Sequence, residues 1–184
     1  MVSAQPRLMT AEDVWELEDV GWTYELHRGT LVKVPGAGLE ASEIAVNISS
    51  PLHAFVRERR LGRVTGADGS YILARNPDVL FVPDVAFIAD DRLPPPDQRH
   101  RFAEAVPNLV VEVISPSDRS TEVNDKVLTY LELGVELVWV VDPPHRIVIV
   151  WTSSRAAHIL REDEVLDGGT VLPDFRLPVT SIFT

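Results

Sequence analysis

The most informative hydrophobic pattern lies at residues 107–116, PNLVVEVISP, where bulky and mostly β-branched residues stand between two prolines. A short apolar run between turn signals is typical of a strand that is buried on both faces of a sheet. One carboxylate, Glu112, interrupts the run. A charge at such a position is costly unless a cation, a metal or a proton compensates it. A structural ion pair is the ordinary interpretation of a buried glutamate, and a metal site is the alternative that other residues favour.

Three segments carry apolar residues at helical spacing. Residues 10–20 predict a short amphipathic helix. Residues 40–59 predict a longer one that Pro51 interrupts, so we expect a kink there or two abutting pieces. Residues 121–133 predict a third helix that ends at Gly134, a residue type favoured just beyond a helix C-terminus.

Alternating apolar and polar residues predict strands between these helices. Segments 23–27 and 30–34 form a predicted hairpin, with Glu25 on the face opposite Tyr24 and Leu26. The stretch from 62 to 74 also predicts a hairpin, and residues 84–89 predict a single strand. Each of these segments is bounded by glycine, proline or polar turn residues.

The C-terminal third of the chain is dominated by strand patterns. Residues 136–142 form a second apolar run, and the segments 145–151 and 156–161 predict a meander that follows it. A short β segment is expected at 170–172, and the last residues predict one helical turn. The order of elements indicates an α/β (α+β) chain with a mixed sheet, in which residues 107–142 form a parallel, right-handed crossover.

The length of 184 residues suits one domain, 1–184, with a substantial core. Within it we distinguish an N-terminal helix and hairpin at 10–35, a core at about 40–161 and a tail at 162–184. The apolar fraction of 45% and the charged fraction of 24% are those of an ordinary globular protein.

Composition excludes several classes of protein. No uncharged apolar stretch approaches the roughly 18 residues of a membrane-spanning helix, and no secretory signal is visible, so a cytoplasmic protein is expected. The absence of cysteine excludes disulfides and thiolate chemistry. The net charge of −11 is the wrong sign for a broad basic surface that binds nucleic acid. It still permits a local basic cleft or a metal ion that screens acidic residues from phosphate.

Two further residues could join Glu112 in a chemical site. Asp84 follows a proline and opens a strand, where side chains reach solvent and ligands. Asp78 stands in a similar PDV motif, but its Asn-Pro-Asp context is typical of a turn, so Asp84 is preferred. Lys126 lies beside the apolar stripe of its predicted helix, which directly follows the Glu112 strand. Alone, Lys126 would be interpreted as a lysine whose stem covers apolar surface.

Two carboxylates and a lysine are the groups that phosphodiester hydrolysis can use. Mg²⁺ takes oxygen ligands and keeps several waters, so Asp84 and Glu112 would suffice to bind Mg²⁺ or Mn²⁺. The metal would neutralise phosphate charge and acidify a bound water, while Lys126 would orient that water or stabilise the developing oxyanion.

The motifs YELHRG, VPDVAF, LVVEVISPSDR, YLELGV, VWVVDP and LPDFRLP extend this picture over most of the chain. Together they resemble the bacterial Uma-two-like family of restriction endonucleases, within the PD-(D/E)XK nuclease superfamily. The resemblance implies a restriction-endonuclease-like fold, a central mixed β-sheet flanked by helices, and a homodimeric nuclease acting on nucleic acid, with DNA expected.

The chain departs from the superfamily motif at one position. The motif places a lysine two residues after Glu112, where this sequence has Ile114. The resemblance implies that the lysine has migrated to Lys126 on the following helix. It also assigns Glu25, in YELHRG, as a further metal or water ligand, although a surface residue of the hairpin is the ordinary interpretation.

Two other functions remain open from the sequence. A non-catalytic module that keeps the nuclease fold and binds a partner would explain the acidic charge and the missing lysine at position 114. A metal-dependent hydrolase of small phosphorylated substrates would also fit the acidic surface. The steep salt dependence of DNA binding would separate these possibilities from a nuclease.

Overall fold

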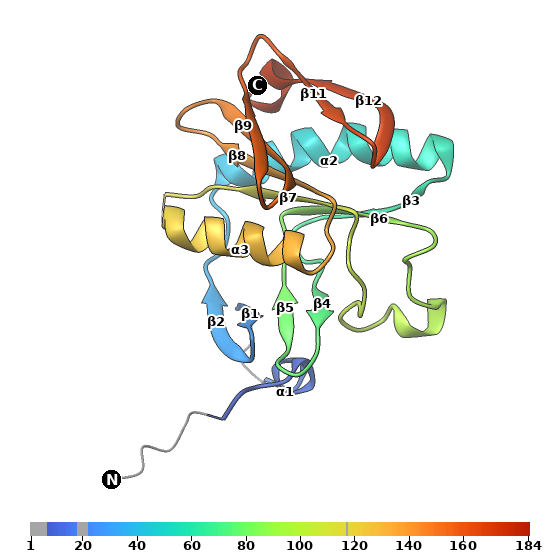
Figure 1. Cartoon of the computed structure of the whole chain (residues 1–184), viewed down its shortest axis with the longest axis vertical. Coiled ribbons are helices and arrows are strands. Elements are labelled where there is room, and N and C mark those ends of the chain that lie inside the picture. The colour runs from blue at the N-terminus through green and yellow to red at the C-terminus, as the bar shows by residue number, and fades with distance from the viewer. Residues whose placement is uncertain (1–6, 18–21, 117) are drawn as a thin grey trace.

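A computed structural model describes residues 7–17, 22–116 and 118–184, and Figure 1 shows their arrangement. The helices are α1 (Ala11–Trp15), α2 (Leu39–Arg59) and α3 (Ser120–Glu132), with 3₁₀ turns η1 (Pro96–Gln98) and η2 (Val179–Ile182). The strands are β1 (Thr23–His27), β2 (Thr30–Val34), β3 (Gly62–Thr65), β4 (Tyr71–Ala74), β5 (Val79–Phe81), β6 (Val85–Ala89), β7 (Leu109–Val113), β8 (Leu137–Asp142), β9 (Ile147–Ser153), β10 (Ala156–Leu160), β11 (Val165–Gly168) and β12 (Leu172–Pro178).

A six-stranded mixed sheet forms the centre of the fold, in the order β10-β9-β8-β7-β6-β3. The strand β7 pairs in parallel with β8 through the crossover helix α3, and the other neighbours are antiparallel. In Figure 1 its strands β7, β6 and β3 run between α2 and α3. The mixed sheet flanked by helices and the parallel crossover at 107–142 are therefore confirmed.

The alternation along β7 explains how the two faces of this sheet are used. Leu109, Val111 and Val113 pack into the core beneath α2, together with the C-terminal segments β11, β12 and η2. Val110 packs into the opposite core, which contains Val127 and Tyr130 of α3. Glu112 lies between Val111 and Val113, so its side chain emerges on the α3 side, the face that Val110 also uses.

A smaller antiparallel sheet, in the order β2-β1-β5-β4, stands beside the central one, with α1 on its outer side (Figure 1). The predicted hairpin of β1 and β2 is confirmed, with Leu26 opposite Leu31. Leu26 and Leu80 face α1 in a third hydrophobic cluster. Glu25 and Phe81 therefore point to the other face of this sheet, toward α3.

The hairpin predicted for residues 62–74 is wrong. Its first half, β3, pairs with β6 at the edge of the central sheet, whereas its second half, β4, pairs with β5 in the smaller sheet. The glycine-rich link between the two halves carries the chain from one sheet to the other. Strand β4 forms a local hairpin with β5, with Ala74 opposite Val79, whereas the pairing of β3 with β6 joins residues more than 20 positions apart. The strand β5 follows the predicted Asn-Pro-Asp turn and was not predicted.

Three other boundaries differ from the prediction. The first helix ends at Trp15, and residues 18–21, where its predicted end falls, lie outside the described part of the chain. The second helix continues through Pro51 without separating into two pieces, because its apolar face packs on the sheet on both sides of the proline. Residues 170–172 form the turn and first residue of a hairpin, β11–β12, rather than a strand of their own.

The predicted helical turn at the end of the chain is η2, which buries Ile182. Within the described residues, none of the helices is long and apolar enough to cross a membrane.

Asp78 holds α1 against the smaller sheet. Its side chain is nearly buried, and it accepts hydrogen bonds from Ala11 N at 2.9 Å, Arg75 Nη1 at 2.8 Å and Asn76 N at 3.3 Å. Ala11 N is the first amide of α1, whereas Arg75 and Asn76 belong to the turn before β5, so Asp78 ties this turn to α1. The preference for Asp84 over Asp78 as a candidate site residue agrees with this arrangement.

We predict that Asp78→Ala lowers the free energy of unfolding by about 1–3 kcal/mol, because it leaves a buried amide and part of a guanidinium without their acceptor. The exposed Asp91→Ala serves as the control and should change stability little. Chemical denaturation measures both, and hydrogen exchange should show α1 losing protection in Asp78→Ala alone. Equal stability of the two variants would contradict this role for Asp78.

Candidate active site

The four side chains predicted as site residues meet on the α3 side of the central sheet, where it adjoins the smaller sheet. Glu25 comes from β1, Asp84 from the residue before β6, Glu112 from β7 and Lys126 from α3. Contacts or short-range electrostatic interactions link all four. Segments separated by about 100 residues in the sequence therefore contribute to one cluster, which we call the Lys126 site.

The ammonium group of Lys126 lies at the centre of this site. Its Nζ is 2.8 Å from Glu25 Oε1, 2.9 Å from Glu112 Oε1 and 3.0 Å from Glu112 Oε2. Only 15% of the Lys126 side chain is exposed, so the head group is paired with carboxylates rather than solvated. Burial lowers the pKa of this amine, but the charges of Glu112 and Glu25 outweigh burial and raise it well above its ordinary value. Lys126 is therefore a fixed positive charge within reach of Glu112.

Glu112 is held from two sides by α3. The hydroxyl of Tyr130, one helical turn beyond Lys126, donates to Glu112 Oε1 at 2.7 Å. Tyr130 is fully buried, and burial together with the nearby Glu112 raises the pKa of its hydroxyl well above the ordinary value. Tyr130 is therefore a neutral hydrogen-bond donor that orients the carboxylate.

Glu25 is 3% exposed, so the interpretation as a surface residue of the hairpin is wrong. Its Oε1 accepts a hydrogen bond from Val82 N at 2.9 Å, and its Oε2 lies 3.0 Å from Nε2 of His27. Burial raises the pKa of this carboxyl, but Lys126, His27 and the Val82 amide together outweigh burial and lower it. Glu25 is accordingly ionised at neutral pH.

Asp84 completes the site from the entrance to β6. Its Oδ2 accepts a hydrogen bond from Val113 N at 2.7 Å, which places it beside the end of β7 next to Glu112. Burial raises the pKa of this carboxyl, and the nearby carboxylates of Asp118 and Glu25 add to the effect. The bond to Val113 occupies one carboxylate oxygen of Asp84.

The charges of the site do not balance. Three carboxylates share one ammonium, so full ionisation leaves a net charge of −2 (three negative charges less one positive). Burial, together with repulsion from Asp84 and Glu25, outweighs Lys126 and raises the pKa of Glu112 to about 7. A divalent cation would neutralise the remaining charge, and a proton on Glu112 neutralises half of it.

This raised pKa predicts a pH dependence of stability. Since the folded state holds a proton on Glu112 that the unfolded chain loses near pH 4.5, Glu112 stabilises the fold below that pH. The contribution is lost as the pH rises toward 7, and it amounts to about 3 kcal/mol over that interval. We expect the stability of the wild type to fall between pH 5 and about pH 7 relative to Glu112→Gln. Chemical denaturation across this range measures the difference, and parallel profiles would contradict the prediction.

The donor set fits a hard divalent cation without forming a complete cage. Within the described ranges, no group of three or more histidine or acidic side chains is arranged to hold a metal. Mg²⁺, however, commonly uses one or two carboxylates and completes its shell with waters and substrate phosphates. Asp84 and Glu112 supply two such carboxylates, and the net negative charge favours a cation between them.

Two side chains in the site were not predicted. His27 follows Glu25 at the spacing that puts both on one face of β1, and its ring packs against Phe81 with centroids 4.8 Å apart. Tyr130 follows Lys126 by four residues, the spacing of neighbours on one face of a helix. Both spacings are readable from the sequence. The Phe81 ring, 5.6 Å from Lys126 Nζ, belongs to the unpredicted strand β5.

Comparison with solved structures supports the same fold. A crystal structure from Anabaena variabilis, described as a putative nuclease belonging to DUF820, superposes with a TM-score of 0.81 at 19% identity. The match covers 95% of this chain and 97% of that chain. It shows a shared fold along nearly the whole chain, and the predicted restriction-endonuclease-like fold is confirmed.

A protein-family model matches the chain over nearly its whole length. Among curated proteins no relative matches. The family model Uma2, described as "Putative restriction endonuclease", matches residues 11–180, a range that contains all four residues of the Lys126 site. The family is the one that the motifs of the sequence resemble. This chain therefore belongs to the Uma2 family of restriction-endonuclease-like proteins.

Proposed function

We propose that this protein is a divalent-metal-dependent nuclease that hydrolyses phosphodiester bonds, with DNA as the expected substrate. The observation that carries the proposal is the placement of Lys126 Nζ within 3.0 Å of both Glu25 and Glu112, beside Asp84. Family membership supports a nuclease. The metal, the DNA substrate and the role of Lys126 are our inferences from the chemistry of the site.

Asp84 and Glu112 would hold Mg²⁺ or Mn²⁺, which when bound supplies charge neutralisation of the phosphate and a more acidic water. Lys126 keeps a positive charge at all physiological pH values, so its Nζ can donate to an oxygen of the phosphate as negative charge develops. Glu25 anchors Lys126 from the opposite side. Tyr130 keeps Glu112 oriented toward the site.

The same geometry supports the proposal that the lysine has migrated. Ile114, the residue after the end of β7, occupies the position where the superfamily motif has a lysine, and its side chain packs into the core beneath α3. Lys126 approaches Glu112 from α3, which covers the same face of β7. An amine can therefore approach Glu112 either from the end of β7 or from α3. We propose that Lys126 replaces the lysine that position 114 lacks.

Calorimetric titration with Mg²⁺ or Mn²⁺ tests the metal site directly. We expect the wild type and the exposed control Asp91→Ala to bind, and Asp84→Ala and Glu112→Ala to lose binding. Because a proton leaves Glu112 when a cation arrives, the affinity should rise with pH toward 7. Binding that persists in both site variants would contradict this assignment. No binding and no cleavage by the wild type would favour the partner-binding alternative.

A homodimer is part of the proposal, because cutting both strands of a duplex is simplest with two sites. Sedimentation equilibrium, with and without duplex DNA, measures the molar mass. A species of twice the mass of 20.5 kDa supports the dimer, and a monomer under both conditions would contradict it.

A further inference from the structure

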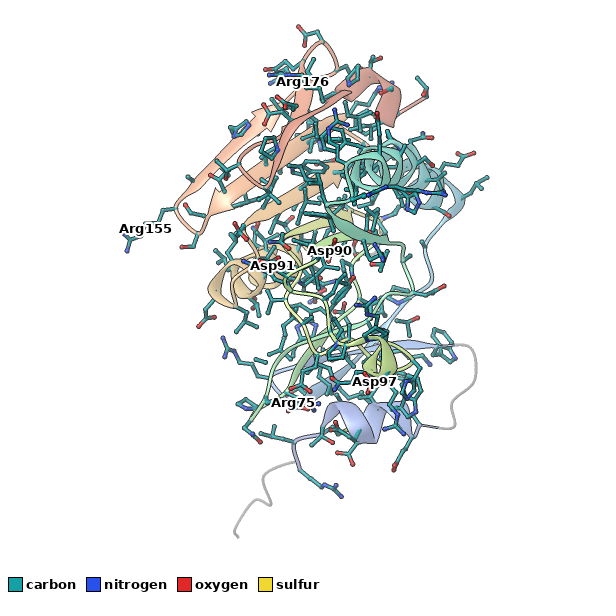
Figure 2. The ribbon with its side chains drawn as sticks, turned by 90° about the vertical axis from the view of Figure 1, so that its right-hand side faces the viewer. Arg75, Asp90, Asp91, Asp97, Arg155 and Arg176 are labelled. Carbon is teal, nitrogen blue, oxygen red and sulfur yellow. The ribbon has the colours of Figure 1, made fainter. Side chains whose placement is uncertain are left out.

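A concentrated basic surface lies outside the Lys126 site. Residues 57–63, RERRLGR, contain four of the 17 lysine and arginine residues of a chain that has 28 acidic ones. Three of these arginines, Arg57, Arg60 and Arg63, line a hollow of about 440 Å³ together with His53. We call this feature the arginine hollow. Asp90, which is labelled in Figure 2, also lines the hollow.

The arginines of the hollow are not neutralised by strong ion pairs. Arg63 lies 3.9 Å from Asp90, and both side chains are more than half exposed, so the pair is weak. Among the described residues, no acidic side chain forms an ion pair with Arg57 or Arg60. The hollow therefore carries a net positive charge, although the chain as a whole has a net charge of −11.

Favourable interaction with the dipole of α2 accounts for only part of the cluster. Favourable interaction with the helix dipole is confined to the last turn of α2, which contains Arg57 and Arg59. Arg60 is the C-cap residue of α2 in the left-handed conformation (φ 55°), whereas Arg63 lies on β3, away from the helix end. A β-carbon at Gly62 would stand 2.0 Å from the carbonyl oxygen of Ile88, so only glycine allows β3 to approach β6 this closely. The C-terminal end of α2 and the edge strand β3 therefore hold the arginines close together on the surface.

We propose that the arginine hollow binds the phosphates of a nucleic-acid backbone at a distance from the bond that is cut. The inference rests on the proposed nuclease function and names a second contact with the same substrate. The guanidinium group matches phosphate geometry and keeps its charge, so exposed arginines with weak ion pairs or none suit a polyanion. Among the described residues, no phenylalanine, tyrosine or tryptophan lines the hollow, so we expect contacts to phosphate without base recognition.

The position of the hollow predicts how long a substrate must be. Gly62 pairs with Ala89, at the opposite end of β6 from Asp84. Five residues of strand separate these ends by about 17 Å, which corresponds to about five base pairs along a duplex. A substrate much shorter than this should not benefit from the arginines.

Binding without cleavage tests the inference independently of activity. The probe is a labelled DNA duplex of about 30 base pairs, titrated in chelator by fluorescence anisotropy at several salt concentrations. For Arg57→Gln/Arg60→Gln we expect about tenfold weaker binding at low salt and a salt slope reduced by about 1.8, since each lost phosphate contact removes about 0.9. The control, Arg155→Gln/Arg176→Gln, removes the same charge from two exposed positions outside the hollow, Arg155 in the turn after β9 and Arg176 on β12, both labelled in Figure 2.

The outcomes separate this inference from the proposed function. Weaker binding by the hollow variant alone supports the inference, whether or not the wild type cleaves. Equal binding and equal slopes in the hollow variant and the control would overturn it, as would a wild type that does not bind the duplex. With an active wild type, hydrolysis of bis(p-nitrophenyl) phosphate should be the same in both double variants, and only the KM for long DNA should rise in the hollow variant.

Discussion

Replacing Lys126 by methionine should lower the free energy of unfolding by about 3–5 kcal/mol at pH 8, the expected cost of removing one partner of a buried ion pair. The variant keeps the length of the side chain but leaves Glu25 and Glu112 close together without a cation. Both carboxylates are largely buried, so water cannot replace the ammonium well. Urea denaturation followed by circular dichroism measures the loss.

The chain offers a matched control, because it contains only one other lysine, Lys33. Lys33 is exposed and lies over the ring of Trp22, so Lys33→Met should cost less than about 1 kcal/mol. Combining Lys126→Met with Glu112→Gln should restore part of the lost stability, since two carboxylates rather than three then remain in the site without a cation. Equal stability of the two single variants would show that Lys126 does not hold the carboxylates together.

Replacing Glu112 by glutamine should lower kcat for phosphodiester hydrolysis at least about 100-fold, which corresponds to about 3 kcal/mol of transition-state stabilisation. The amide can still accept the hydrogen bond from Tyr130, so the fold is kept while the charge that would hold the metal is lost. Steady-state rates at saturating Mg²⁺ measure the effect. Retention of most of the activity by Glu112→Gln would contradict a metal-binding role.

The pH profile of the wild type gives a second view of the same residue. Only ionised Glu112 can hold a cation, and its pKa of about 7 means that protons compete with the metal below neutrality. We therefore expect the rate at low Mg²⁺ to rise with pH up to about 7, and the rise to shift to lower pH as the Mg²⁺ concentration increases. Rates that are independent of both variables between pH 5 and pH 8 would contradict this account.

The strand that carries Glu112 could be predicted because its signal is local. A mostly β-branched apolar run predicts a doubly buried strand, and the helix and second run that follow it predict the crossover. The helical stripe of α3 likewise placed Lys126 beside Tyr130. Both site residues therefore belong to elements whose periodicity alone fixes the direction of their side chains.

The long-range pairings could not be predicted in this way. The glycines of residues 62–74 are compatible with a tight hairpin, and nothing local indicates that β3 and β4 belong to different sheets. Glu25 is buried because the smaller sheet faces α3. This packing joins elements that are distant in the sequence, so no local pattern indicates it. Its role was implied by family resemblance, whereas its contacts with Lys126, His27 and Val82 required the structure.

The most direct test of the central claim is cleavage of a labelled duplex DNA by the wild type and by Asp84→Asn, with Mg²⁺ and with chelator. The amide of asparagine can still accept the bond from Val113, and Asp91→Asn controls for loss of charge at an exposed position. We predict cleavage by the wild type and the control only when Mg²⁺ is present, and none by Asp84→Asn. Cleavage that is equal in Asp84→Asn, or that continues in chelator, would contradict the claim that the Lys126 site is a metal-dependent phosphodiesterase.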